Sequence, residues 1–320
     1  MTEKIENDVL IIGSGPAGYT AAIYAARANL NPHLVSGLEP GGQLTITTDV
    51  ENYPGFENVI QGPWLMEQMK EQAVKVGTIF HNDIVTSVDF EKNPFTSQTE
   101  SGKEFVSKSI IIATGAQARW LNLESEKKFK GFGISACATC DGFFFKDQQV
   151  AVIGGGNSAV EEAMFLTKFA SKVLLIHRRD SLRAEKILQE RLFNNKKIEV
   201  IWNSKVSEFV GEENPNTLKK IILENTLDGT KTTIDVNGAF IAIGHDPATS
   251  LFIDKLKMDE ENYIITKPDS TETSIKGVFA AGDIVRGASL VVWAIKDGRD
   301  AALSIKSYLE NIELKKSKVA

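Results

Sequence analysis

Two glycine-rich turns, each placed directly after an apolar run, constrain what this chain can fold into more than any other feature. Val9–Ile12 precede Gly13-Ser-Gly-Pro-Ala-Gly18, and Val150–Ile153 precede Gly154-Gly-Gly-Asn-Ser-Ala159. In such β-α-β units the first glycine makes the tight turn, the second lets the backbone approach a pyrophosphate, and the third allows close helix–strand packing. The helix that follows presents free N–H groups to the phosphates. The pattern predicts an α/β fold with two Rossmann-like, three-layer nucleotide-binding domains.

The order of the segments indicates that one domain is inserted into the other. The first copy of strand, glycine turn and helix leads to a strand that ends at Thr114-Gly115, and the second leads to one that ends at Ile243-Gly244. A strand that ends at Gly282-Asp283 and a final helix over about 289–310 come only afterwards. The expected domains are residues 1–118 with 248–320, and residues 119–247.

Composition and charge exclude several classes of function. The net charge of -6 and the pI near 5.5 argue against nucleic acid and anionic membranes as partners. No apolar run reaches the roughly 18 residues that a membrane span needs. The polar N-terminus leads straight into a strand, so we expect no signal peptide and a cytoplasmic, reducing location. In that setting an isolated Cys-x-x-Cys is more often catalytic than structural.

The chain has two cysteines, Cys137 and Cys140, and they form such a pair. A Cys-x-x-Cys closes into a reversible disulfide, in which one thiolate attacks an incoming disulfide and the other resolves the mixed disulfide. Asp141 follows directly and is placed to move the protons. The alternatives are half of a zinc site or two buried apolar cysteines. Zinc needs four ligands, and the four histidines are scattered, so we predict no metal site.

The residues after each second strand distinguish the two expected nucleotide sites. In the first site this strand ends at Ser36-Gly37, without the usual ribose-binding acid, and Glu39 is the nearest carboxylate. In the second site the run from His177 contains Arg178, Arg179 and Arg183. Guanidinium groups suit the 2′-phosphate of NADPH rather than NADH. The alternatives are a simple turn, a solvated basic turn and, for His177, a packing role.

Taken together, the motifs resemble the low-molecular-weight, bacterial-type thioredoxin reductases over nearly the whole of residues 1–283. The resemblance rests on Cys137-Ala-Thr-Cys-Asp141, Gly41-Gly-Gln-Leu44, Glu51-Asn-Tyr-Pro-Gly-Phe56, the run His177–Arg183, and Gly282-Asp283. It implies a homodimer with FAD in the first domain and NADPH in the inserted domain. It also implies a rotation of the NADPH domain that brings either the nicotinamide or the dithiol to the flavin.

The resemblance further assigns roles to individual residues. Cys140 would exchange electrons with the flavin, Cys137 would attack the thioredoxin disulfide, and Asp141 would be the acid/base. The residues expected to bind FAD are Gly13, Ser14, Gly15, Pro16, Ala17, Gly37, Glu39, Gly42, Gln43, Leu44, Asn52, Thr114, Gly115, Gly282, Asp283, Ser289, Leu290 and Val291. Those expected to bind NADPH are Gly154, Gly156, Asn157, Ser158, His177, Arg178, Arg179, Arg183, Ile243 and Gly244.

One segment departs from the family. Where the family usually carries Arg-Gln-Ala at the start of the last helix, residues 284–299 are similar to the corresponding segment in the small subunit of glutamate synthase. Asp283 can still accept hydrogen bonds from ribityl hydroxyls. The N–H groups near Ser289 to Val291 can still face the flavin carbonyl.

Other functions are compatible with parts of this pattern. A larger peroxiredoxin reductase would need an additional N-terminal module, and a glutamate synthase subunit would need further cysteines for iron–sulfur clusters. A ferredoxin or flavodoxin reductase would not need the cysteine pair. A flavin-binding redox sensor would switch once, whereas an enzyme consumes NADPH continuously. The preferred hypothesis is an NADPH-dependent thioredoxin-disulfide reductase.

Overall fold

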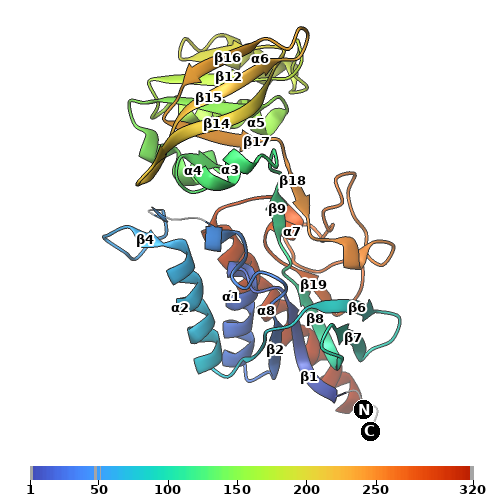
Figure 1. Ribbon diagram of the computed structural model, residues 1–320. Helices are drawn as coiled ribbons and strands as arrows, with labels where there is room; N and C mark the ends of the chain where they lie inside the picture. Colours follow the sequence, from blue (N-terminus) through green and yellow to red (C-terminus); the bar gives the residue numbers. More distant parts are fainter. Residues whose placement is uncertain (1–2, 47–48, 51, 318–320) are drawn as a thin grey trace. The chain divides into compact units, whose positions relative to one another are not determined.

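The computed structural model describes residues 3–46, 49–50 and 52–317, and the chain divides into two compact units (Figure 1). Unit one comprises Met1–Gln117 and Asp246–Ala320, and unit two comprises Ala118–His245. The chain leaves unit one at β9 (Ala116–Ala118) and returns at β18 (His245–Pro247). Glu51, the first residue of one family motif, lies outside the described residues.

Unit one is built on a sheet with strand order β5-β2-β1-β8-β7-β6, in which β19 also pairs with β8. Strands β5, β2, β1, β8 and β19 run parallel to one another. Strand β7 pairs antiparallel with β8, and β6 pairs antiparallel with β7. The sheet strands are β1 (Glu3–Ile12), β2 (Pro32–Val35), β5 (Ile79–His81), β6 (Val85–Asp89), β7 (Phe95–Thr99), β8 (Lys103–Ile112) and β19 (Val278–Ala280). The remaining elements are α1 (Pro16–Arg27), η1 (Gly42–Ile46), β3 (Asp49–Val50), β4 (Ile60–Gln61), α2 (Gly62–Lys75), η3 (Ser250–Phe252), α7 (Asp283–Arg286) and α8 (Val291–Ser317).

Unit two repeats the parallel arrangement in a five-stranded sheet of order β10-β17-β11-β12-β13. A separate antiparallel sheet, β14-β15-β16, packs its apolar side chains into one of the unit's core clusters. The strands are β10 (Ile134–Ser135), β11 (Gln149–Gly154), β12 (Lys172–Ile176), β13 (Ile198–Ile201), β14 (Ser204–Glu213), β15 (Asn216–Asn225), β16 (Lys231–Asp235) and β17 (Gly238–Ala242). The helices are α3 (Glu124–Phe129), α4 (Ala138–Asp141), η2 (Gly142–Phe145), α5 (Asn157–Leu166) and α6 (Lys186–Phe193).

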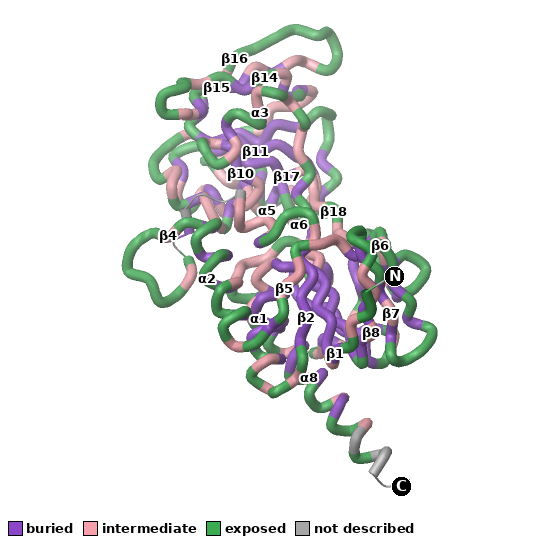
Figure 2. Tube along the Cα trace, turned by 60° about the horizontal axis from the view of Figure 1, so that its bottom comes forward, coloured by how far each residue is buried: buried purple, intermediate pink, exposed green. Residues whose placement is uncertain are grey.

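Strand β1 is longer than the apolar run Val9–Ile12 that predicted it. Its polar first half, from Glu3 to Asn7, pairs with Lys103 to Ser107 of β8. Figure 2 shows the central strands of this sheet as buried. The extension lacks the continuous apolar signal because Glu3 and Lys4 are exposed, so apolar patterning recognises only the inner half of the strand.

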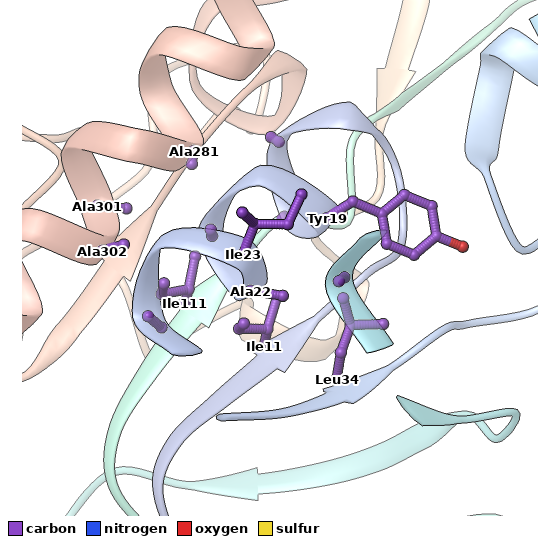
Figure 3. Close-up of a cluster of buried hydrophobic side chains, with 14 of the residues drawn as sticks. Ile11, Tyr19, Ala22, Ile23, Leu34, Ile111, Ala281, Ala301 and Ala302 are labelled. Atoms are coloured by element: carbon purple, nitrogen blue, oxygen red, sulfur yellow. The ribbon is translucent and has the colours of Figure 1, made fainter. Parts of the chain in front are cut away.

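The core of unit one depends on small side chains between α1 and α8. Figure 3 shows Ala301 and Ala302 of α8 near α1, with Ile11 and Ile111 of the sheet on the other side of α1. A Cβ atom at Gly298 would lie 2.2 Å from the Ala17 carbonyl oxygen, so the backbones of the two helices meet there. Glycine at position 298 therefore sets the separation between α8 and α1.

Replacing Gly298 with alanine should destabilise the protein by about 1–3 kcal/mol, since the backbone collision exceeds the roughly 1 kcal/mol gained in helix propensity. Urea unfolding measures the change. Ser307→Ala on the exposed face of α8 is the control and should stay within about 0.5 kcal/mol of the wild type. Equal stability of Gly298→Ala and the control would contradict the packing argument.

Two histidines, the buried His33 and the half-buried His81, form a pair inside the same sheet. The Nδ1 atom of His33 on β2 lies 2.9 Å from Nε2 of His81 on β5, and the ring of Phe105 stands edge-on to both imidazoles. One nitrogen donates and the other accepts, so at least one of the two rings is neutral. Burial and the neighbouring His81 lower the pKa of His33 to about 4, and burial lowers the pKa of His81.

This pair should make the protein less stable in mild acid. The unfolded chain binds protons with the ordinary histidine pKa near 6.5, whereas the folded chain does so only near 4, so stability is full above 6.5 and falls below it. For His33 the loss between pH 7 and pH 5 is about 2 kcal/mol. Thermal unfolding of wild type and His33→Val/His81→Phe checks this, and an unchanged pH dependence in the variant would refute it.

Among the described residues, no helix combines the length and apolar character needed to cross a membrane.

Candidate active site

The cysteine pair lies at the start of the short helix α4 of unit two, with Cys137 directly before the helix and Cys140 within it. Cys137 and Cys140 form a disulfide, with 5.3 Å between their Cα atoms. The N–H groups of Cys140 and Asp141 both donate to the Cys137 carbonyl oxygen, at 3.3 and 3.1 Å, and the Cys137 N–H donates to the Ser135 hydroxyl at 3.0 Å. Both cysteines are partly exposed. The backbone thus holds the two sulfurs at bonding distance while leaving them reachable.

Three polar groups accompany the disulfide. Asp141 is partly exposed at the end of α4, directly after Cys140. The Thr139 hydroxyl lies 3.4 Å from Cys137 Sγ. Glu162 on α5 accepts a hydrogen bond from the Ala138 N–H, and burial raises the pKa of its carboxyl to about 7. The sequence pattern identified Asp141 but missed Thr139 and Glu162. No known motif requires a threonine or a glutamate at these positions, so nothing in the sequence marks them.

The first glycine turn has the shape that a pyrophosphate requires. Cβ atoms at Gly13 and Gly18 would lie 2.3 Å from the Ala113 carbonyl oxygen and 2.0 Å from the Gly13 carbonyl oxygen. A Cβ at Gly15 would meet no atom within 4 Å. Helix α1 begins at this open point without a side-chain cap. Its first N–H groups therefore suit an anionic ligand, as the sequence predicts.

Ser14 gathers the other predicted segments around this turn. Its buried hydroxyl donates to the Ser36 carbonyl oxygen at 2.9 Å and accepts the Gly41 N–H at 3.1 Å. A Cβ at Gly42 would lie 3.7 Å from Gly15 Cα. The end of β2 and the start of η1, which carries Gln43 and Leu44, thereby lie beside the glycine turn.

The remaining residues expected to bind FAD differ in how the structure places them. A Cβ at Gly282 would lie 2.9 Å from Ala17 Cβ, so Gly282 borders the turn. Gly115 has a positive φ of 73°. The Thr114 hydroxyl donates to the Ala248 carbonyl oxygen at 2.9 Å, which joins the two stretches of unit one. Glu39 and Asn52 are exposed.

Asp283 is the carboxylate of this site. The N–H and hydroxyl of Ser289 donate to it at 3.2 and 2.9 Å, and burial raises its pKa to about 6. Arg286 and the buried Asp297 form a two-point ion pair nearby, in which the Arg286 Nη2 to Asp297 Oδ1 distance is 2.6 Å. Asp297 also accepts the Gly282 N–H at 3.4 Å. The atypical segment 284–299 therefore supplies its own bracing for the Gly-Asp turn.

The second glycine turn has the same geometry. A Cβ at Gly154 would lie 2.3 Å from the Ala242 carbonyl oxygen, a Cβ at Gly156 would meet no atom within 4 Å, and α5 begins at Gly156 without a side-chain cap. A Cβ at Gly155 would collide with the His177 ring, whose Nδ1 lies 2.9 Å from the Gly154 carbonyl oxygen. Burial lowers the pKa of His177. His177 therefore supports the turn from behind.

Backbone hydrogen bonds join the arginine loop, residues 178–183, to this second turn. The N–H groups of Arg183 and Ala184 donate to the Gly155 carbonyl oxygen, at 2.7 and 3.2 Å. The side chains of Arg178, Arg179 and Arg183 are exposed. Asn157 accepts the Glu185 N–H at 2.8 Å and fixes the start of α6. Ser158 is exposed, and Ile243 and Gly244 follow β17.

These features define the class of protein. Two open glycine turns of the dinucleotide-binding type and a reachable disulfide are the equipment of an oxidoreductase that connects a pyridine nucleotide with a disulfide. The family model described as "Pyridine nucleotide-disulphide oxidoreductase" matches residues 7–298.

Individual relatives narrow the class. A thioredoxin reductase of Rickettsia felis is 56% identical over 307 residues, which cover 96% of this chain and 99% of the relative. One from Rickettsia conorii is 59% identical over 281 residues, covering 88% and 91%. The solved thioredoxin reductase of Streptococcus pyogenes matches with a TM-score of 0.89 at 43% identity, covering 96% and 99%. The chain belongs to the low-molecular-weight, bacterial type of thioredoxin reductase, which confirms the family predicted from its motifs.

Proposed function

We propose that the protein reduces the disulfide of thioredoxin with electrons from NADPH, by way of FAD and the Cys137–Cys140 pair. The observation that carries this proposal is the partly exposed disulfide on α4, held in the same unit as an open glycine turn with a latched arginine loop. The FAD site belongs to unit one and the NADPH site to unit two. Family membership supports the choice of thioredoxin as the acceptor.

FAD, when bound, supplies the two-electron carrier between NADPH and the disulfide. The uncapped N–H groups at the start of α1 bind its pyrophosphate, and the absence of a side chain at Gly15 leaves room for it. Asp283 would accept hydrogen bonds from the ribityl hydroxyls, with its carboxyl oriented by Ser289. Gly282, the η1 residues and Ser289 to Val291 complete the site.

NADPH binds by the same principle at the start of α5. The open backbone at Gly156 receives the pyrophosphate, and His177 keeps the turn in place from behind. Arg178, Arg179 and Arg183 present guanidinium donors to the 2′-phosphate. The two hydrogen bonds from the loop to Gly155 keep these donors beside the turn.

The chemistry at sulfur is a thiol–disulfide exchange. Reduction by two electrons breaks the Cys137–Cys140 bond, and Cys140 is the sulfur that exchanges electrons with the flavin. The Cys137 thiolate then attacks one sulfur of thioredoxin, forming a mixed disulfide and releasing a thiolate that Asp141 protonates. The Cys140 thiolate attacks Cys137, which restores the disulfide and releases the second thioredoxin sulfur.

The proposal includes a homodimer in a cytoplasmic, reducing setting. Exposed apolar side chains on α1, α2 and α8 of unit one support a second copy as partner. They include Tyr24, Trp64, Val74, Trp293 and Leu303. We further propose that residues 284–299 are related to the small subunit of glutamate synthase. The Arg286–Asp297 pair braces the Gly-Asp turn in this version of the segment.

Steady-state NADPH oxidation by the purified flavoprotein, with and without oxidised bacterial thioredoxin, tests the function. Sustained oxidation that depends on thioredoxin is the expected result. If NADPH reduces the flavin but thioredoxin gives no turnover, the acceptor is wrong and other disulfides or proteins must be tried. A single switch without turnover would favour a redox sensor.

The cysteines should separate the two halves of the reaction. Cys137→Ser and Cys140→Ser should each abolish thioredoxin reduction yet leave reduction of the flavin by NADPH intact, because hydride transfer precedes the disulfide. Stopped-flow absorbance of the flavin measures the first half and thioredoxin turnover the second. Loss of flavin reduction in both variants would contradict the order of steps.

The arginines should determine the choice of nucleotide. Alanine at Arg178, Arg179 or Arg183 should weaken NADPH binding by roughly 1.5–3 kcal/mol for each lost charged hydrogen bond and leave NADH nearly unaffected. The ratio of kcat/KM for NADPH and NADH measures this. Arg191→Ala, an exposed arginine on α6, is the control. An equal loss of kcat/KM for NADPH and NADH would contradict the assignment of these arginines to the 2′-phosphate.

A further inference from the structure

Glu162 is a half-buried residue near the cysteine pair, and the reaction above does not use its carboxyl. It lies on α5, which packs against α4 through a cluster that includes Ala138, Val160 and Ala163. Its carboxyl accepts a hydrogen bond from the Ala138 N–H, which belongs to the peptide that joins Ala138 to Cys137. The Oε2 atom is buried and has no hydrogen-bond partner. A group this costly to bury calls for a reason.

Within its surroundings, the cysteine turn is the part of the protein that affects the ionisation of Glu162 besides burial itself. Its neighbour Glu161 is exposed to solvent. Among the described residues, no charged side chain contributes to the pKa of Glu162, whose causes are burial, which raises it, and the Ala138 N–H, which lowers it. The charged groups on elements packed against α5 are Asp141 on α4, Lys172 on β12, and Lys186, Glu190 and Arg191 on α6.

We propose that Glu162 is a positioning residue for the dithiol, which holds the peptide after Cys137 and whose charge state is coupled to that of the reduced cysteines. The inference deepens the proposed function and rests on it. Its basis is a carboxyl with one oxygen on the backbone of the cysteine turn and the other unpartnered in an apolar interior.

The coupling follows from charge balance. Two electrons break the S–S bond and leave a negative charge on each sulfur, which proton uptake neutralises as the pH falls. The new negative charge disfavours a second one nearby, so reduction raises the pKa of Glu162 and draws a proton onto its carboxyl. The effect is reciprocal, and an ionised Glu162 raises the pKa of the thiol. Because the carboxyl titrates near pH 7, the two forms exchange in the working range.

Alkylation of the reduced cysteines tests this without any turnover. The full-length flavoprotein is reduced with dithiothreitol, freed of it, and treated with iodoacetamide from pH 6 to pH 9, and mass spectrometry follows each cysteine. Glu162→Gln keeps the size and the acceptor oxygen but removes the charge. It should react about three- to tenfold faster at pH 8 and lose the inflection near pH 7. Glu161→Gln removes the same charge from the exposed neighbour and should match the wild type.

A second variant separates position from charge. Glu162→Met keeps the volume but loses the hydrogen bond to Ala138, so it should match the alkylation profile of Glu162→Gln while reducing thioredoxin more slowly than that variant. Superimposable profiles for Glu162→Gln and wild type would overturn the coupling. An equal shift in Glu161→Gln would do the same.

Wild-type protein provides a test that survives misfolding of either variant. The infrared carboxyl band titrated in the oxidised and reduced states should show a carboxyl near pH 7 whose pKa rises on reduction. A carboxyl that titrates identically in both states would overturn the inference. Failure of thioredoxin as a substrate would contradict the proposed function but leave the alkylation and infrared results unaffected.

Discussion

Contact of backbone with backbone at glycine is the constraint on which both nucleotide-binding turns depend. At Gly13 and Gly154 the chain passes so close to the carbonyl oxygens of Ala113 and Ala242 that no side chain fits. That approach brings the end of β1 against the end of β8, and the end of β11 against the end of β17. The helix then begins beside an open backbone position, at Gly15 and at Gly156, with its first N–H groups uncapped. The same turn therefore provides both the close backbone contact and the open position beside the helix.

The two units use this turn with different supports. In unit one the neighbouring group is the buried carboxyl of Asp283, oriented by Ser289 and backed by the Arg286–Asp297 pair. In unit two it is a basic loop, latched by its own backbone to Gly155, with the His177 ring behind. An acidic acceptor suits hydroxyl groups, and exposed guanidinium groups suit a phosphate. The glycine turn suits the pyrophosphate that both nucleotides contain. The neighbouring carboxyl or arginine loop suits the groups in which the two nucleotides differ.

Most of the features that could be predicted depend on local sequence patterns. The features that could not be predicted depend on contacts between residues far apart in the chain. The glycine turns and the cysteine pair are readable because each function needs particular residue types at short spacing. The polar half of β1 escaped because its partner, β8, begins at Lys103, far along the chain. The His33–His81 pair escaped for the same reason. Glu162 has no sequence signature, since its meaning comes only from the packing of α5 on α4.

The hydroxyl of Ser14 has a wider consequence. One oxygen donates to the Ser36 carbonyl and accepts the Gly41 N–H, so three segments of the chain share a single side-chain atom. Only a hydroxyl can give and receive at one point in so small a space. The loop that leaves β2 is therefore not an independent lid over the glycine turn. Its conformation and that of the turn form one cooperative unit, and a ligand that orders either one orders both.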